Sequence, residues 1–169
     1  GVILGDMHTN IEKGKDVFDS MILAQILTLI GQGDPTALVE AERVITAAIP
    51  LSPKRQQLYF TLARIQLLEG RADVALQVLN QVVADEPAIG ESHWLLNIAL
   101  RQSGKDTEAW AETKKAMENG YAWRAAEEIR YAIELAVRFG SAEDRVALAE
   151  ALVSAGGGAS ALATLAEFE

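Results

Sequence analysis

Two histidines, His8 and His93, are the side chains best suited to acid–base or metal chemistry in this 169-residue chain. A metal site needs several ligands brought together, and neither histidine has a second one three or four residues away. Ser92 precedes His93, but neighbours on a helix point about 100° apart and do not form a nucleophile–base pair by themselves. We therefore expect His93 to be a packed, hydrogen-bonded helix residue.

Carboxylates are abundant, with adjacent pairs at Asp85-Glu86 and Glu127-Glu128. Adjacent acids on a helix or at its end usually form a solvated face, so these pairs do not indicate a catalytic dyad. The chain has no cysteine, which excludes a disulfide scaffold, a thiolate zinc site and a thiol nucleophile. The glycines at 156–158 follow no strand and precede no Lys-Ser or Lys-Thr pair, so they are interpreted as a hinge. The sequence predicts no catalytic residue, no cofactor and no metal.

The charge balance restricts the class of partner. Lys and Arg number 15 against 24 Asp and Glu, a net charge of -9, and no basic block compensates for it. Because affinity for nucleic acid comes largely from clustered cations, we expect no nucleic-acid partner. The strongly apolar uncharged run at residues 20–33 is shorter than the roughly 18 to 20 residues that cross a bilayer, so we expect no membrane insertion of this segment. The predicted location is the bacterial cytoplasm, as a soluble protein.

A period of 34 residues organises the middle of the chain. Four residue types recur at this spacing, in the pairs Pro53 and Pro87, Leu62 and Leu96, Gly70 and Gly104, and Ala75 and Ala109. Within each unit apolar residues recur every three or four positions, which is typical of amphipathic helices. No segment alternates with the period of two that a strand needs, so the expected fold class is all-α.

Glycine and proline divide the pattern into helices. We expect helices near 15–30, 35–49, 53–69, 72–84, 88–103, 106–119, 122–139 and 142–155. Asp34-Pro35 and Ser52-Pro53 are typical of an N-cap followed by proline, and left-handed helix ends are expected at Gly31, Gly70, Gly104 and Gly140. The predicted organisation is an N-terminal extension at 1–16, helical repeats at 17–155, and a glycine hinge with a capping helix at 156–169.

The repeating unit resembles the tetratricopeptide repeat. In the best copy, residues 56–89, the family positions are held by Leu62, Ala63, Gly70, Ala75 and Pro87. The resemblance covers about residues 17–155 and implies a right-handed α–α superhelix of about four helical hairpins. It further implies a non-catalytic scaffold that binds a protein or peptide in its concave groove.

In this family the first helix of each unit builds the concave wall. Carried over to this chain, the resemblance implies a partner-binding groove lined by Phe60, Arg64, Leu67, Trp94, Ile98, Arg101 and Arg130. Trp and Arg are enriched at binding hot spots, so Trp94 with Arg64 and Arg101 is expected to grip a partner that carries a carboxylate. The alternative is that Trp94 packs against a neighbouring helix.

Two further interpretations stay open. The segments 51–70 and 86–105 resemble the repeat tails of bacterial membrane proteins of the O-antigen ligase or polymerase type, which would make this chain a soluble docking or regulatory domain. The apolar terminal helices could instead mediate self-association, which would make the chain a homo-oligomer.

Overall fold

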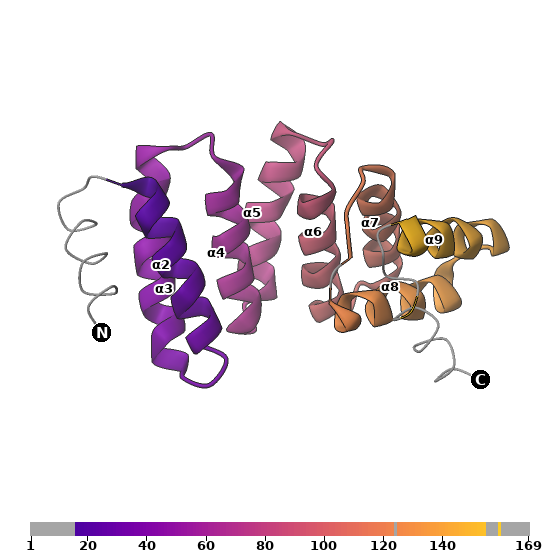
Figure 1. Cartoon of the computed structure of the whole chain (residues 1–169), viewed down its shortest axis with the longest axis horizontal. Coiled ribbons are helices and arrows are strands. Elements are labelled where there is room, and N and C mark those ends of the chain that lie inside the picture. Colours follow the sequence, from indigo (N-terminus) through magenta and orange to yellow (C-terminus); the bar gives the residue numbers. More distant parts are fainter. Residues whose placement is uncertain (1–15, 124, 155–158, 160–169) are drawn as a thin grey trace. The chain divides into compact units, whose positions relative to one another are not determined.

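The computed structural model describes residues 16–123, 125–154 and 159, and it divides into two compact units. The first unit ends at Val82 and the second begins at Val83, inside helix α5. All regular elements in the described part of the chain are helices, which confirms the all-α class (Figure 1). In the first unit these are α2 (Val17–Ile30), α3 (Pro35–Ala48), the 3-10 helix η1 (Ile49–Leu51), α4 (Gln56–Leu68) and most of α5 (Ala72–Asp85). The second unit contains α6 (Gly90–Gln102), α7 (Asp106–Glu118), α8 (Ala126–Phe139) and α9 (Ala142–Ser154).

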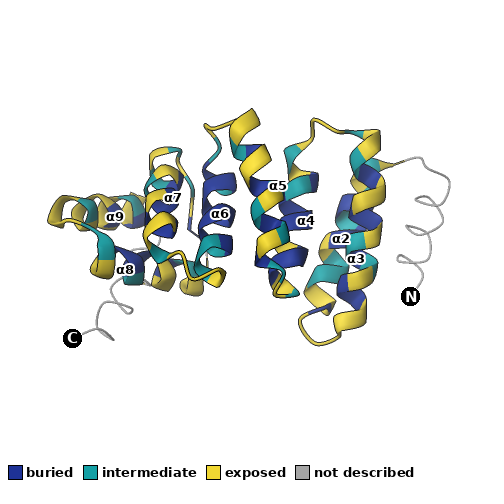
Figure 2. Cartoon of the chain, turned by 180° about the vertical axis from the view of Figure 1, so that it is seen from behind, coloured by how far each residue is buried: buried dark blue, intermediate teal, exposed yellow. Residues whose placement is uncertain are grey.

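The first unit is a pair of helical hairpins around one apolar core. Leu23 of α2, Ile45 of α3 and Ile65 of α4 are fully buried in the same cluster, and Val78 of α5 packs against it. Ala41 and Ala75 are also fully buried, and their small side chains allow neighbouring helices to approach closely. Figure 2 shows the buried residues on the sides of these helices that face one another.

Local hydrogen bonds fix where the first helices begin. Asp34 accepts a bond from the backbone N–H of Thr36 at 3.0 Å, with Pro35 at the first helical position, so the predicted N-cap of α3 is confirmed. Bonds from the Thr36 hydroxyl and backbone hold the pKa of Asp34 below its usual range. Asp16 caps α2 in the same way, through the N–H of Phe18 at 2.8 Å.

An ion-pair group ties the α4–α5 turn to α3. The Arg71 guanidinium lies 2.6 Å from a carboxylate oxygen of Glu42 and also pairs with Glu69. Hydrogen bonds to Glu42 and then to Glu69 raise the pKa of Arg71. Since Glu42 belongs to α3 and Arg71 precedes α5, this contact holds the second hairpin against the first.

The predicted start of α4 at Ser52-Pro53 is wrong. Helix α3 continues into η1, the N–H of Arg55 donates to the Ser52 carbonyl at 3.0 Å, and α4 begins three residues after Pro53, at Gln56. The Tyr59 hydroxyl donates to the Pro53 carbonyl at 2.8 Å, so the proline is held in the turn before the helix.

The glycines serve two different purposes. Gly70 and Gly104 have φ of 72° and 74°, which confirms the left-handed ends predicted there. Gly31 and Gly140 were predicted to be the same but have φ of -63° and -84°. At these positions a side chain has no room: a Cβ at Gly31 would overlap Leu38, and one at Gly140 would lie 2.6 Å from the Ala136 carbonyl oxygen. They are needed for close approach and not for a turn.

In the second unit, the α8–α9 hairpin runs across the direction of α6 and α7 (Figure 1). The predicted helix at 122–139 begins only at Ala126, and the segment at 119–123 is not helical and carries the buried Trp123. Trp94 of α6 stacks on Tyr121 with ring centroids 5.4 Å apart, and Trp123 meets Trp94 edge-on at 5.9 Å. We call the segment at 119–123 the aromatic linker. It stands before α8 in the place that the short turn at Pro87 has before α6, and it sets the direction of α8.

Parts of the predicted organisation lie outside the described residues. These are the N-terminal extension except Asp16, and the hinge with its capping helix except Ala159. None of the helices that the structure describes has the length and apolar character required to cross a membrane.

Replacing Ala75 by Phe tests the packing between helices. Because Ala75 is fully buried, the larger ring overpacks the first unit and should cost about 1–3 kcal/mol of unfolding free energy or more. Gln77→Phe, at an exposed position of the same helix, is the control and should cost less than about 0.5 kcal/mol. Thermal unfolding followed by circular dichroism measures both, and equal melting temperatures would contradict the assignment.

Candidate functional site

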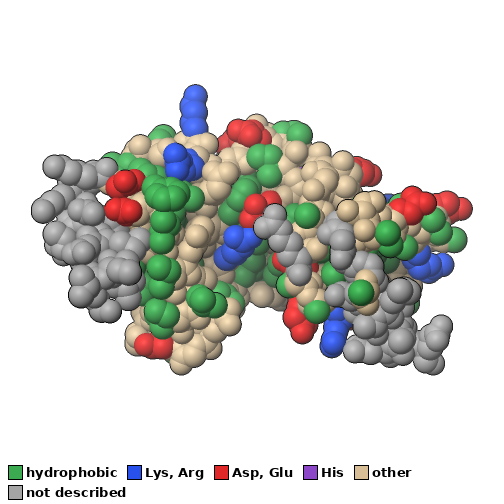
Figure 3. All heavy atoms as spheres, viewed as in Figure 1, with side chains coloured by type: hydrophobic (Ala, Val, Ile, Leu, Met, Phe, Trp, Pro, Cys, Tyr) green, Lys and Arg blue, Asp and Glu red, His purple; other side chains and the backbone are tan. Residues whose placement is uncertain are grey.

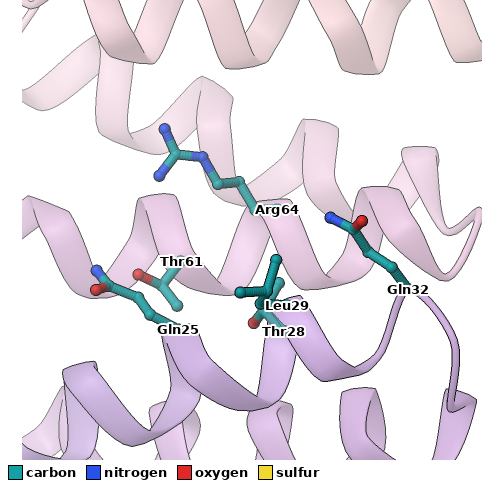
Figure 4. Close-up of a pocket in the computed structure, with 6 residues that line it drawn as sticks. All are labelled: Gln25, Thr28, Leu29, Gln32, Thr61 and Arg64. Carbon is teal, nitrogen blue, oxygen red and sulfur yellow. The ribbon is translucent and has the colours of Figure 1, made fainter. Parts of the chain in front are cut away.

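The first unit carries a pocket between α2 and α4, which are the first helices of its two hairpins. Its volume is about 240 Å³, and Gln25, Thr28 and Leu29 of α2, Gln32 of the following turn, and Thr61 and Arg64 of α4 line it (Figure 4). We call this surface the first-helix face. Phe18 lies on the same stripe of α2, seven residues before Gln25 and eleven before Leu29.

Two of the polar side chains that line the pocket are already hydrogen-bonded to the backbone of their own helices. The Thr28 hydroxyl donates to the Ala24 carbonyl at 2.6 Å, and the Thr61 hydroxyl donates to the Gln57 carbonyl at 2.9 Å. Their protons point into the helix backbones, so these hydroxyls do not donate into the pocket, and the side-chain amides of Gln25 and Gln32 are donors that line it. Figure 4 shows Arg64 extending toward the Gln25 and Thr61 end, with Leu29 between Arg64 and Gln32. The pocket therefore combines hydrogen-bond donors with an apolar side chain.

Exposed apolar side chains border the pocket, and none of its lining residues is acidic. Leu29 is 69% exposed and Phe18 is 57% exposed, and Figure 3 shows a column of apolar side chains over α2. None of the residues that line the pocket is Asp or Glu, and α4 contains no acid along its whole length. This contrasts with the chain as a whole, in which acids outnumber bases. An exposed apolar surface beside a cation is a feature of protein-binding sites.

Three residues predicted to line the groove are core residues instead. Trp94 is 1% exposed because Tyr121 and Trp123 cover its ring, so the expected anchor is not available to a partner in this conformation. Phe60 and Leu67 are buried as well. The prediction is corrected for these side chains, and for Trp94 the alternative of packing within the protein is what the structure shows.

The other predicted groove residues are accessible to different degrees. Arg64 and Arg130 are exposed, while Ile98 is half-buried against the core of the second unit. Arg101 is held in place: its guanidinium donates to Glu134 at 3.0 Å and lies 4.4 Å from the centre of the Tyr131 ring. An arginine with a carboxylate and an aromatic ring already bound stabilises the position of α8.

Sequence reasoning missed several residues of the pocket and of the aromatic linker. Of the six residues that line the pocket, the predicted groove contained Arg64 alone, because the prediction carried over family positions and did not use exposure. The exposed apolar stripe of α2 was a signal that could have identified Leu29. Tyr121 and Trp123 were also missed, although two aromatics beside a missing proline indicated an unusual linker.

His93 belongs to a buried polar group, as predicted. Its Nδ1 lies 2.6 Å from Glu112 Oε2, and its Nε2 lies 2.7 Å from the Pro87 carbonyl oxygen. A carbonyl can only accept, so Nε2 donates to Pro87, and Nδ1 forms the hydrogen bond with Glu112. Lys115 pairs with the other Glu112 oxygen at 2.8 Å. Both ring nitrogens are thus engaged, while His8 lies outside the described residues.

Solved structures with the same arrangement of helices identify the fold. The protein TTC0263 of Thermus thermophilus, described as a thermophilic TPR protein, matches with a TM-score of 0.61 and 21% identity, covering 90% of this chain and 89% of its own. The chain has a tetratricopeptide-like fold. MamA from Desulfovibrio magneticus RS-1 matches with a TM-score of 0.55 and 16% identity over 94% of this chain and 93% of its own. MamA of strain MSR-1 matches with a TM-score of 0.53 and 17% identity, covering 85% of this chain and 79% of its own.

Sequence comparison adds no closer relationship. No protein-family model matches the chain, and no curated protein has significant sequence similarity to it. At the identities given above, the tetratricopeptide-like neighbours show the fold alone. None of these three neighbours is described as a glycan ligase or polymerase, so the predicted link to that class gains no support.

Removing either member of the His93–Glu112 pair should destabilise the second unit. His93→Ala or Glu112→Ala leaves the other buried group without its partner, at a cost of about 1–3 kcal/mol. The double variant should lose less unfolding free energy than the sum of the losses of the two single variants. Glu108→Ala, at an exposed position on the same helix, is the control with less than about 0.5 kcal/mol. Urea unfolding measures all four, and additive losses would contradict a direct pairing.

Proposed function

We propose that this chain is a protein-interaction scaffold that holds a segment of another protein on the first-helix face, without catalysis of its own. The observation that carries the proposal is the pocket between α2 and α4, bordered by apolar side chains that are exposed on an otherwise well-packed unit. Exposed apolar patches with polar borders are typical of interaction sites. The tetratricopeptide-like fold supports the same function, because stacked helical hairpins leave one side of each first helix uncovered for a partner.

The polar groups of the protein agree with a binding role. His93 and Glu112 are the buried acid–base pair in the described part of the chain, and they are closed off from solvent. Catalytic groups need access to a substrate, whereas this pair has its bonds satisfied within the hairpin. The accessible polar residues of the first-helix face include the amides of Gln25 and Gln32, which suit recognition of hydrogen-bond acceptors.

A second copy of the chain is the second candidate partner. The apolar column over α2 favours it, because the stretch from Ser20 to Ile30 has no charge and two copies could meet there without like-charge repulsion. Sedimentation velocity over a wide concentration range separates the two candidates. A monomer at all concentrations leaves the foreign segment as the partner.

Leu29→Ser tests the first-helix face directly. Removing this exposed side chain should reduce the binding of a captured partner about tenfold or more without changing the melting temperature, since the side chain is not in the core. Val39→Ser is the matched control, because Val39 is 64% exposed on α3 and lies outside the pocket. Equal binding by the wild type and both variants would contradict the proposed site.

A further inference from the structure

We propose that Asn119 is a site of spontaneous deamidation, and that its conversion to an acidic residue loosens the aromatic linker from α6. Asn119 directly follows α7 and is the first residue of the aromatic linker. The modification is independent of the first-helix face, because Asn119 belongs to the second unit.

Asn119 is followed by Gly120, whereas the other three asparagines of the chain precede isoleucine or glutamine. Deamidation begins when the backbone nitrogen of the next residue attacks the side-chain carbon Cγ of asparagine. Glycine has no Cβ that would obstruct this approach, so an Asn-Gly pair reacts more readily than the other pairs in this chain. The Asn119 side chain is also partly exposed, so water and dissolved base reach it.

The reaction takes its reagents from the solvent. A base removes the proton of the Gly120 N–H, and the nitrogen forms a bond to Asn119 Cγ. The bond between Cγ and Nδ2 breaks, and Nδ2 takes up a proton and leaves as ammonia. Water then opens the resulting succinimide ring. Opening at Cγ gives aspartate, and opening at the former backbone carbonyl gives isoaspartate, in which the main chain runs through Cγ.

The folded end of α7 slows this reaction. The attacking group is held, because the Gly120 N–H donates to the Met117 carbonyl at 3.1 Å. The attacked group is held as well, because the side-chain amide of Asn119 donates to the Lys115 carbonyl at 2.8 Å. Gly120 has the left-handed φ of 70° that such a helix end requires. Modification therefore proceeds when this last turn opens, and opening at a helix end costs less free energy than global unfolding.

Both products weaken the end of α7. The carboxylate of aspartate cannot donate to the Lys115 carbonyl, and it adds a negative charge at the negative end of the helix dipole. Isoaspartate lengthens the main chain by one carbon and turns the backbone carbonyl of Asn119 into a charged carboxylate. A modification that changes charge here acts on the contacts of the helix end.

The backbone of Asn119 lies in a closely packed place. A Cβ at Gly90, the first residue of α6, would lie 2.9 Å from the Asn119 carbonyl oxygen and 2.8 Å from the Tyr121 nitrogen. Tyr121 in turn stacks on Trp94 with ring centroids 5.4 Å apart. A charge or an extra backbone atom at Asn119 therefore disturbs the contact that keeps Trp94 covered.

Incubation followed by peptide mapping tests the modification. The whole chain is kept in mildly alkaline buffer, either folded or unfolded in guanidinium chloride, and tandem mass spectrometry of tryptic peptides quantifies the conversion of amide to acid. We expect Asn119 to be converted about tenfold more slowly in the folded chain than in the unfolded chain, because the last turn must open first. Asn80 is exposed on α5 but precedes glutamine, so it is the internal control and should stay intact.

Asn119→Asp tests the structural consequence, because it reproduces the aspartate product. Its tryptophan emission should shift to longer wavelength and its melting temperature should fall, and the incubated wild type should change in the same direction. Asn80→Asp adds the same charge at an exposed position and should change neither quantity. Asn119→Gln keeps an amide but does not form the five-membered ring, so its emission should stay constant during the incubation.

Two results would overturn the proposal. The site is wrong if Asn119 stays intact in the folded chain while it is converted in guanidinium chloride, or if it is converted no faster than Asn80. The loosening of the aromatic linker is wrong if the emission of both Asn119→Asp and the converted wild type equals that of the fresh wild type.

Discussion

The close approach of helices at alanine residues is the constraint on which both units depend. Ala41 and Ala75 in the first unit, and Ala109 in the second, have no exposed surface. A methyl group at a crossing point lets two backbones come near enough for the larger side chains on either side to interdigitate. The sides of α2 and α4 that line the pocket form the first-helix face.

The two units meet this constraint in different ways. The buried cluster of the first unit is made of aliphatic side chains. The second unit adds a polar group at the same kind of interface, where His93 and Glu112 join α6 to α7, and it fills the next interface with the aromatic rings of Trp94, Tyr121 and Trp123. Polar groups hold a helix pair in one register because a shifted arrangement would leave them unpaired. Polar contacts therefore fix the register of a helix pair in the second unit, whereas the first unit relies on apolar packing.

Sequence reasoning predicted the hairpins well because their signals are local and repeated. Apolar spacing placed nearly every helix, and Gly70 and Gly104 ended helices as expected. Predictions failed where tertiary contacts decide. A Cβ at Gly31 would overlap the Leu38 side chain across the hairpin, and Pro53, whose carbonyl accepts a bond from Tyr59, lies in the turn before α4. The candidate site was predicted less well than the fold. Arg64, which the family positions named, is exposed, but the cover that Tyr121 and Trp123 provide for Trp94 depends on how their linker folds back.

The placement of the tryptophans determines which unit intrinsic fluorescence reports on. All three tryptophans, Trp94, Trp110 and Trp123, belong to the second unit and are buried there, while the first unit has none. Intrinsic tryptophan emission is therefore a reporter of the second unit alone, and its Trp94 and Trp123 signals depend on the aromatic stack that turns α8. Loss of structure confined to α2–α4 would leave this emission unchanged while the helical circular dichroism falls, so the pair of signals distinguishes sequential from concerted unfolding.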